Sequence, residues 1–228
     1  MKNLIIIPAR KSSKRIKNKN LVNVLNKPLI YWTINYAKKL SKKNYDLVVT
    51  SDCNKIDKIC RKEKVSFLKR PKKISNDHSS MHEVIFHAIN KLNHNYKYII
   101  LLQPTSPLRR FSLVKRSINI LNNKKKFDSL IHLAKDRSFI GKVINNHWKP
   151  DYNLNIRTQD INKKYLPTGN IYVYRSFLYK NRIKLPKKTY GLITSDEKWI
   201  DIDNIEDLEI LKYYLKDFKI KKKLIYCK

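Results

Sequence analysis

A short apolar run cut off by proline constrains the fold of this chain more than any other feature. Residues 4–7 (LIII) precede Pro8, and four apolar residues closed by proline are typical of a buried strand, because a helix usually needs ten or more. A loop of about a dozen mostly polar residues follows. Pro28 then opens an amphipathic segment over residues 29–40, which predicts a helix. This order indicates an α/β fold with an anion site beyond the first strand.

The polar loop is rich in hydrogen-bond donors. It contains no glycine, so it is neither a Walker A loop nor a dinucleotide-binding fingerprint. Backbone N–H groups, arginines and lysines can surround a phosphate at the end of a strand. The alternative is an ordinary solvated loop in a chain that is basic everywhere. The donors of this loop are Arg10, Lys11, Ser12, Ser13, Lys14, Arg15, Lys17, Asn18, Lys19 and Asn20.

Further short apolar runs alternate with amphipathic segments, which is the pattern of one α/β domain over residues 1–228. The predicted strands cover residues 46–50, 65–68, 98–102, 129–133 and 199–203. The predicted helices after the first begin near residues 56, 84, 111 and 205. Gly169 is expected to supply a positive φ in a turn that enters another strand.

The formal net charge of +33 has three competing explanations. A nucleic-acid-binding module would need such charge, and an anionic small substrate would also attract it. The third is compositional bias, since Lys, Asn, Ile and Tyr are frequent and Gly is rare. Because the lysines are spread over the whole length, we favour bias with a contribution from an anionic substrate, and we expect no specific nucleic-acid partner.

The cysteines and the apolar segments bear on the compartment. Cys53, Cys60 and Cys227 form no C-x-x-C pair, and the first two are expected to be buried thiols, which favours a reducing compartment. The first apolar run is too short for a signal peptide, and no window approaches the ~20 apolar residues of a membrane span. We therefore expect a cytoplasmic, soluble protein.

Two runs at predicted strand ends suggest ligand contacts. Gln103 follows the most apolar run, 98–102, where an open α/β sheet places ligands, and its amide suits a base edge or a sugar amide. In Trp199-Ile-Asp-Ile-Asp, strict alternation puts Asp201 and Asp203 on one face, roughly 7 Å apart along a strand. Such a pair can share a hydrated Mg²⁺. Alternatively, Asp203 and Glu206 form a capping pattern for the next helix.

Ser80, Asp52 and Asp77 each have an interpretation as part of local structure, and for Ser80 and Asp77 a role in the site is the alternative. Ser80 and Glu83 match a capping box, and a serine at a helix N-terminus can also bind an anion. Asp52 is expected to cap the helix that begins near residue 56. Asp77 belongs either to loop structure or to the site.

Several motifs together resemble the acylneuraminate cytidylyltransferases, also called CMP-sialic acid synthetases. Residues 8–20 read P-A-R-x-x-S-K-x-x-x-x-K-N and residues 101–109 read L-L-Q-P-T-S-P-L-R. Residues 157–160 (RTQD) and 168–172 (TGNIY) resemble the family's R-R-Q-D and N-G-A-I-Y. Where this chain has Lys11 and Ser12, the family usually has two glycines. The related 3-deoxy-manno-octulosonate enzymes typically carry an acidic Q-G-D-E-P sequence after the strand, which is absent.

The resemblance implies a Rossmann-like, mostly parallel sheet with helices on both faces, of the nucleotide-diphospho-sugar transferase type, and a dimerisation insertion over residues 135–175. It implies that CMP passes from CTP to a nonulosonic acid, with Mg²⁺ as cofactor, in a homodimer. Arg10, Lys19, Asp201 and Asp203 would be catalytic, and the two aspartates would hold the metal. The nucleotide would be bound by Arg10, Ser13, Lys19, Asn20, Arg70 and Ser80, and the sugar by Gln103 and Arg157.

Two alternatives remain open from the sequence. A cytidylyltransferase for 3-deoxy-manno-octulosonate or another acidic sugar would have the same overall pattern, although the neutral run after Gln103 argues against the octulosonate. A basic nucleic-acid-binding module would instead show affinity that falls steeply with salt and no turnover of CTP. For Arg157 the alternative is an ordinary surface arginine.

Overall fold

The computed structural model describes residues 1–40, 44–136, 138, 140–153, 155, 157, 164–180, 186–194 and 199–221. Its centre is a seven-stranded sheet with the strand order β11-β7-β10-β6-β1-β4-β5. β10 runs antiparallel to both of its neighbours, and the other pairings are parallel. The strands are β1 (Lys2–Pro8), β4 (Tyr45–Ser51), β5 (Ser66–Lys69), β6 (Tyr96–Leu101), β7 (Ser129–Asp136), β10 (Lys164–Arg175) and β11 (Thr189–Ile193).

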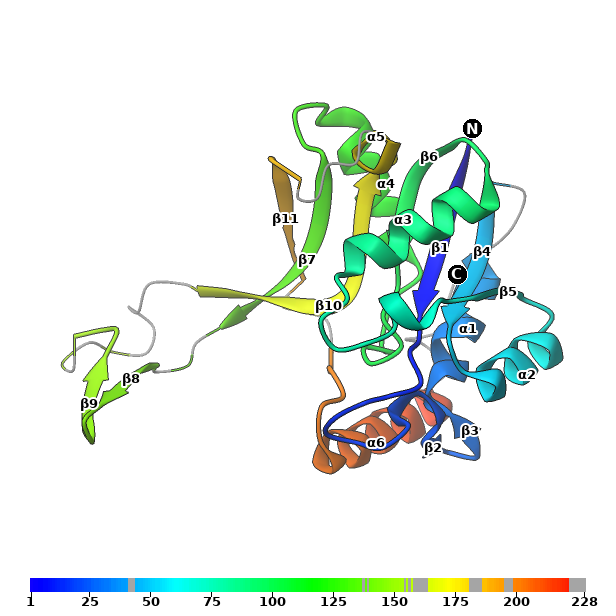
Figure 1. Ribbon diagram of the computed structural model, residues 1–228. Helices are drawn as coiled ribbons and strands as arrows, with labels where there is room; N and C mark the ends of the chain where they lie inside the picture. Colours follow the sequence, from blue (N-terminus) through cyan, green and yellow to red (C-terminus); the bar gives the residue numbers. More distant parts are fainter. Residues whose placement is uncertain are drawn as a thin grey trace.

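Helices cover both faces of this sheet (Figure 1). They are α1 (Leu29–Leu40), α2 (Asn54–Glu63), α3 (Met81–Leu92), α4 (Ser112–Asn123), α5 (Phe177–Lys180) and α6 (Ile205–Lys221). The predicted Rossmann-like, mostly parallel α/β fold is therefore confirmed, and the predicted first helix, residues 29–40, matches α1.

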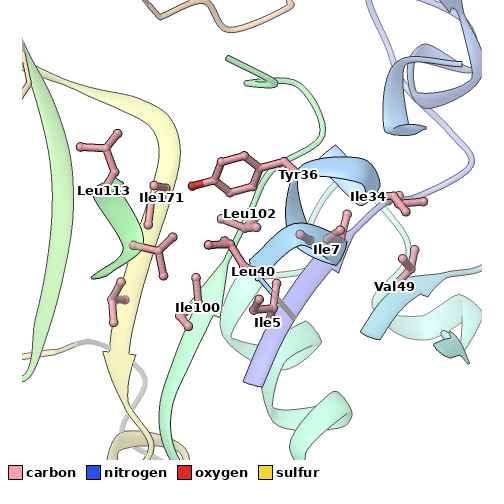
Figure 2. Close-up of a cluster of buried hydrophobic side chains, with 14 of the residues drawn as sticks. Ile5, Ile7, Ile34, Tyr36, Leu40, Val49, Ile100, Leu102, Leu113 and Ile171 are labelled. Atoms are coloured by element: carbon pink, nitrogen blue, oxygen red, sulfur yellow. The ribbon is translucent and has the colours of Figure 1, made fainter. Parts of the chain in front are cut away.

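Alternate residues of each strand serve the two faces. Ile5 and Ile7 of β1 pack with α1, α2 and α4, whereas Leu4 and Ile6 pack with α3 and α5. Figure 2 shows the first of these layers, in which Ile5 and Ile7 lie near Ile34 of α1. Because a strand buried on both faces needs apolar residues at every position, the continuous run LIII forms the central part of the sheet.

A separate apolar cluster lies beyond the carboxyl end of β1. The opening loop contributes Ile16, and the short strands β2 (Asn23–Val24) and β3 (Lys27–Pro28) fold back beside it. α6 contributes Leu208 and Leu211, and both side chains are buried in this cluster. The last described helix is thus packed against the first loop of the chain, as Figure 1 also shows.

The predicted strand over residues 199–203 does not form. Its described backbone-to-backbone hydrogen bond runs from Ile202 N–H to Thr105 O at 2.8 Å, and Thr105 lies in a loop. The alternation of faces is nevertheless as predicted, because Ile200 and Ile202 are buried in the cluster under α6 while Asp201 and Asp203 are partly exposed. The segment passes beyond the end of the sheet, where loops rather than strands are its neighbours.

Gly169 adopts the predicted positive φ, at 70°, but it lies inside β10 rather than in a turn before it. The pairing of β10 with β7 shifts register between Pro167 and Tyr172, so this stretch is an irregularity within one long strand. A Cβ on Gly169 would come far inside contact distance of Ser106 Oγ. The close approach and the positive φ therefore both require glycine.

Two further features complete the fold. The hairpin of β8 (Gly141–Ile144) and β9 (His147–Pro150) stands away from the main body, at the far end of β7 and β10 (Figure 1). No helix in the part of the chain that the structure describes has the length and apolar character needed to cross a lipid bilayer.

Strand β7 carries a buried titratable side chain, His132, which is 1% exposed. Its Nε2 lies 2.8 Å from Ser117 Oγ of α4, and its Nδ1 has no hydrogen-bond partner. Burial, together with the weaker effect of the positive charges of Arg109 and Arg116, lowers the pKa of His132 to about 4. His132 is therefore neutral in the folded protein at neutral pH.

We expect His132 to make the protein less stable in mild acid. Since its pKa is lower in the folded than in the unfolded chain, stability is lost as the pH falls from about 6.5 towards 4. Between pH 7 and pH 5 this residue should lower the free energy of unfolding by about 2 kcal/mol. Urea unfolding at both pH values checks this. His132→Gln should remove that part of the slope, and His78→Gln, at an exposed site, should keep it; equal slopes in all three proteins would contradict the assignment.

Candidate functional site

A cleft with a volume of about 480 Å³ opens at the carboxyl ends of β1 and β6. Its walls come from the opening loop, from the segment around residues 70–84, from the turn after β6 and from Asp203. Of the predicted site residues, the cleft is lined by Arg10, Ser13, Lys19, Asn20, Arg70, Gln103 and Asp203. The structure thus brings together side chains from the beginning, the middle and the end of the chain.

The opening loop forms the cleft wall without glycine. Lys11 and Ser12 do not belong to the residues with positive φ, so replacing the family's two glycines imposes no left-handed backbone there. The left-handed residue of this loop is Asn18, with a φ of 54°, directly before the short 3₁₀ helix η1 (Lys19–Leu21). Asn tolerates this conformation better than most residues. Asn18 thereby turns the chain so that Lys19 and Asn20 face the cleft.

Lys19 connects this loop to the segment before α6. Its ammonium donates to the carbonyl of Ile202 and, at 3.0 Å, to Asp203 Oδ1. Arg15 forms an ion pair with the other oxygen of Asp203. Burial raises the pKa of the Asp203 carboxyl, but the hydrogen bonds from Lys19 and Arg15 outweigh it and leave the pKa below its ordinary value. Asp203 is therefore ionised at neutral pH.

The capping alternative for Asp203 is wrong. Asp207 N–H donates to Asn204 Oδ1 at 2.8 Å, and Asn204 N–H donates to Asp207 Oδ2 at 3.0 Å. Asn204 is thus the capping residue of α6, and Asp207 rather than Glu206 is its reciprocal partner. Because the cap uses these two residues, the carboxylate of Asp203 is left to face the cleft.

Arg70 is a buried cation in the cleft wall. It is 5% exposed and donates from one terminal nitrogen to Thr50 O at 3.0 Å, while its buried Nε has no hydrogen-bond partner among the described residues. Burial lowers the pKa of Arg70 to about 10, partly offset by Asp52. It stays positively charged at neutral pH. A buried cation with spare donor capacity is suited to an anionic ligand.

Asp77 lies across the cleft from the opening loop and pairs with two of its cations. Arg10 donates to Asp77, and Lys14 Nζ lies 3.3 Å from its other oxygen. The hydrogen bond from Arg10 is the main reason why the pKa of Asp77 lies below its ordinary value. Asp77 therefore belongs to the cleft as well as to its loop.

The turn after β6 is held from behind by a buried arginine. Arg109, 3% exposed, donates to the backbone carbonyls of Gln103 and Asn170 and, at 3.0 Å, to Thr33 Oγ1. On the other side of the turn, Ser106 Oγ donates to Asp201 Oδ1 at 3.1 Å. The turn that presents Gln103 is thus tied to the sheet, to α1 and to the segment that carries the two aspartates.

Three predicted site residues do not line the cleft. Ser80 forms the predicted capping box with Glu83 at the start of α3, and its neighbour Ser79 is the serine in the cleft wall. Asp201 lies behind the turn of Gln103, where Ser106 holds it. Arg157 is exposed, and residues 158–160 of its motif lie outside the described part of the chain.

The structure adds residues that sequence reasoning did not single out. Arg15 and Lys14 are in the lining, but in a loop with so many cations nothing in the pattern separates them from their neighbours. The prediction that Asp52 caps α2 is wrong. The N-cap of α2 is Cys53, without a side-chain bond, and Asp52 Oδ1 instead accepts the backbone N–H of Lys11 at 2.7 Å.

The predicted Mg²⁺ is compatible with the donors at this site. Within the described ranges no group of three or more His, Cys, Asp or Glu side chains comes together, which argues against a closed all-protein metal cage. Mg²⁺ commonly uses one or two carboxylates and takes its other ligands from phosphates and water. Asp203, an ionised and half-exposed carboxylate in the cleft, suits that role, and Asp201 is its neighbour two residues earlier.

Comparison with known proteins agrees with this geometry. The pseudaminic acid cytidylyltransferase of Campylobacter jejuni serotype O:2 is 32% identical over 229 residues, covering 95% of this chain and 97% of that protein. The N-acylneuraminate cytidylyltransferase of Escherichia coli O18:K1:H7 is 27% identical over 91% of this chain. This chain spans only 50% of the E. coli protein's length.

A solved structure extends the comparison to the fold. A CMP:2-keto-3-deoxy-manno-octonic acid synthetase in complex with CTP superimposes with a TM-score of 0.69 at 18% identity, covering 95% of this chain and 99% of that chain. The profile of the family described as cytidylyltransferase matches residues 4–223. With nearly the whole sequence matched and the fold in common, this chain belongs to the cytidylyltransferase family.

Proposed function

We propose that this protein transfers CMP from CTP to the anomeric hydroxyl of a nonulosonic acid and releases pyrophosphate. The observation that carries the proposal is the cleft itself, which is lined both by the cations Arg10, Lys19 and Arg70 and by the carboxylate of Asp203. A magnesium-bound triphosphate requires both kinds of group within one site. Nucleotidyl transfer depends mainly on positioning and charge neutralisation, which such groups supply.

The class of sugar rests on the relatives and on Gln103. Relatives named for pseudaminic and N-acylneuraminic acids match 91–95% of this chain. Gln103 lines the cleft with a neutral amide, which can donate to and accept from an N-acyl group of the sugar. The octulosonate alternative lacks support at this position, because the turn Gln103-Pro104-Thr105-Ser106 contains no acid.

The ion pairs in the cleft indicate which cations would bind the phosphates of the nucleotide. Arg10 and Lys14 are paired with Asp77, and Arg15 and Lys19 with Asp203. Phosphate oxygens would take over these cations, together with the unpaired Nε of Arg70. Asp203, and Asp201 once it is released from Ser106, would then hold Mg²⁺. When bound, the metal would neutralise phosphate charge and lower the pKa of the attacking hydroxyl.

The other contacts to the nucleotide and the sugar would come from neutral polar side chains in or beside the cleft. Ser13 and Asn20 lie in the wall beside the cations and would bind the nucleotide, and Ser80 would contribute through the N-terminus of α3. Asn20 also holds the loop, since its amide donates to Arg10 O at 3.0 Å. Gln103 would orient the sugar so that its anomeric hydroxyl faces the α-phosphorus.

The direct test is a pyrophosphate-release assay with a panel of acidic sugars. We expect release that requires CTP, Mg²⁺ and a nine-carbon acid such as N-acetylneuraminic, legionaminic or pseudaminic acid. The eight-carbon 3-deoxy-manno-octulosonate and the other nucleoside triphosphates are the comparison substrates. Preferred turnover of the octulosonate, or none with any nine-carbon acid, would contradict the proposal.

Asp203→Asn should lower turnover by about 10²–10³-fold, because a neutral amide replaces the charge that faces the metal-bound triphosphate. The free energy of unfolding should change by less than about 1 kcal/mol, since the α6 cap uses Asn204 and Asp207. Steady-state kinetics and urea unfolding measure both effects. Asp57→Asn removes the same charge from the surface of α2, where Asp57 pairs with Arg61, and is the matched control. Near-normal turnover of Asp203→Asn would remove this residue from the mechanism.

We also infer that the protein acts as a homodimer through the β8–β9 hairpin. Three large apolar side chains of this hairpin are exposed, namely Val143 at 68%, Ile144 at 47% and Trp148 at 49%. Arg157 is exposed on the same insertion, and in the dimer it would contact the sugar bound in the cleft of the partner subunit rather than the sugar bound in the cleft of its own subunit. Sedimentation equilibrium should give twice the mass of the chain, and Trp148→Glu should shift it towards the monomer. A monomeric parent protein would contradict this assignment.

A further inference from the structure

The backbone ladder between β1 and β4 continues past the last paired residues. Pro8 pairs with Thr50, and Ala9 N–H donates to Thr50 O at 3.0 Å. In a parallel ladder the next donor on the same side is two residues further on, at Lys11, and its acceptor would be the carbonyl of residue 52. The Lys11 N–H instead donates to the side chain of Asp52, at 2.7 Å from Oδ1.

The carbonyls at and just after the end of β4 already accept other hydrogen bonds. Ser51 O accepts from Arg70 N–H at 2.8 Å, and Asp52 O accepts from Lys69 Nζ at 3.2 Å. Both bonds connect the end of β4 to the end of β5, at its last residue Lys69 and at Arg70 directly after it. The carboxylate of Asp52 therefore takes the place of a main-chain acceptor, one step beyond the point where the strand itself ends.

The result is that the backbone around Arg10 is held at three points. Ala9 N–H is bound to Thr50, Lys11 N–H to Asp52, and the carbonyl of Arg10 accepts from the amide of Asn20 at 3.0 Å. No residue of left-handed conformation turns the chain at Lys11 or Ser12, so these hydrogen bonds fix the path of the loop.

We propose that Asp52 is a positioning residue for the nucleotide site, which sets the path of the opening loop so that Arg10 and Ser13 face the cleft. The inferred effect on nucleotide binding rests on the proposed function, whereas the hydrogen bond between Lys11 and Asp52 is observed in the structure. Asp52 lies outside the cleft wall and makes no contact with the space where the nucleotide would bind. Its action passes through the Lys11 amide.

The competing explanation is purely electrostatic. Asp52 also acts on the buried guanidinium of Arg70, where its negative charge favours the protonated form. A charge effect and a hydrogen-bond effect respond differently to substitution. Asp52→Asn removes the charge and keeps an oxygen acceptor for the Lys11 N–H, whereas Asp52→Ala removes both.

The experiment combines hydrogen exchange with CTP binding in the absence of sugar. In Asp52→Ala the Lys11 amide should exchange at least about tenfold faster, and the Kd for CTP, measured by calorimetry with Mg²⁺, should rise about tenfold. Asp52→Asn should keep slow exchange and a Kd within about threefold of the parent. Asp57→Asn, which removes an equivalent charge from α2, should match the parent in both measurements.

Two outcomes would overturn the proposal. Slow exchange at Lys11 together with an unchanged Kd in Asp52→Ala would show that the bond positions nothing. A loss in Asp52→Asn as large as in Asp52→Ala would assign the effect to charge. Since the exchange of Lys11 is measured without substrate, a failure of the proposed function would appear separately, as an absence of pyrophosphate release with any acidic sugar.

Discussion

The bond between Lys19 and the segment at Ile202 and Asp203 is the interaction on which the cleft depends. It joins residues that are 183 and 184 positions apart and closes the space between the first loop and the start of the last described helix. Without it, the cations of the opening loop and the carboxylate of Asp203 would face solvent separately. The pair is only partly buried, so its charges remain available for exchange with a ligand.

The apolar cluster under α6 makes that bond possible. Ile200 and Ile202 are buried beside Ile16 and Leu29, which come from the opening loop and the start of α1. Burial of these side chains stabilises the contact by an amount that an exposed ion pair alone would not supply. Since each buried isoleucine is next to an aspartate, packing and chemistry are set by the same short segment. A substitution that loosens Ile202 would therefore displace Asp203 as well.

Much of the fold could be predicted from the sequence, because short apolar runs and amphipathic segments are local signals. The first strand, the first helix and the capping box of Ser80 and Glu83 all formed where predicted. Two of the predictions that failed depended on partners distant in sequence. Residues 199–203 alternate like a strand but have no strand beside them, and Asp52 precedes a helix but accepts the backbone N–H of Lys11 at its carboxylate. A local sequence pattern therefore predicts the backbone conformation of a residue more reliably than it predicts the hydrogen-bond partner of its side chain.

What the sequence by itself determined is the inventory: the donors of the opening loop, the neutral turn at Gln103, and two aspartates separated by one isoleucine. Residue types and their spacing carry this information, since it is local to each motif. Only the tertiary structure decided which of these groups share a cleft. It placed Asp203 against Lys19 and put Asp201 behind Ser106. The physical reason is that burial and hydrogen bonding between segments far apart in the chain decide these contacts. No single segment contains the information about its distant partner.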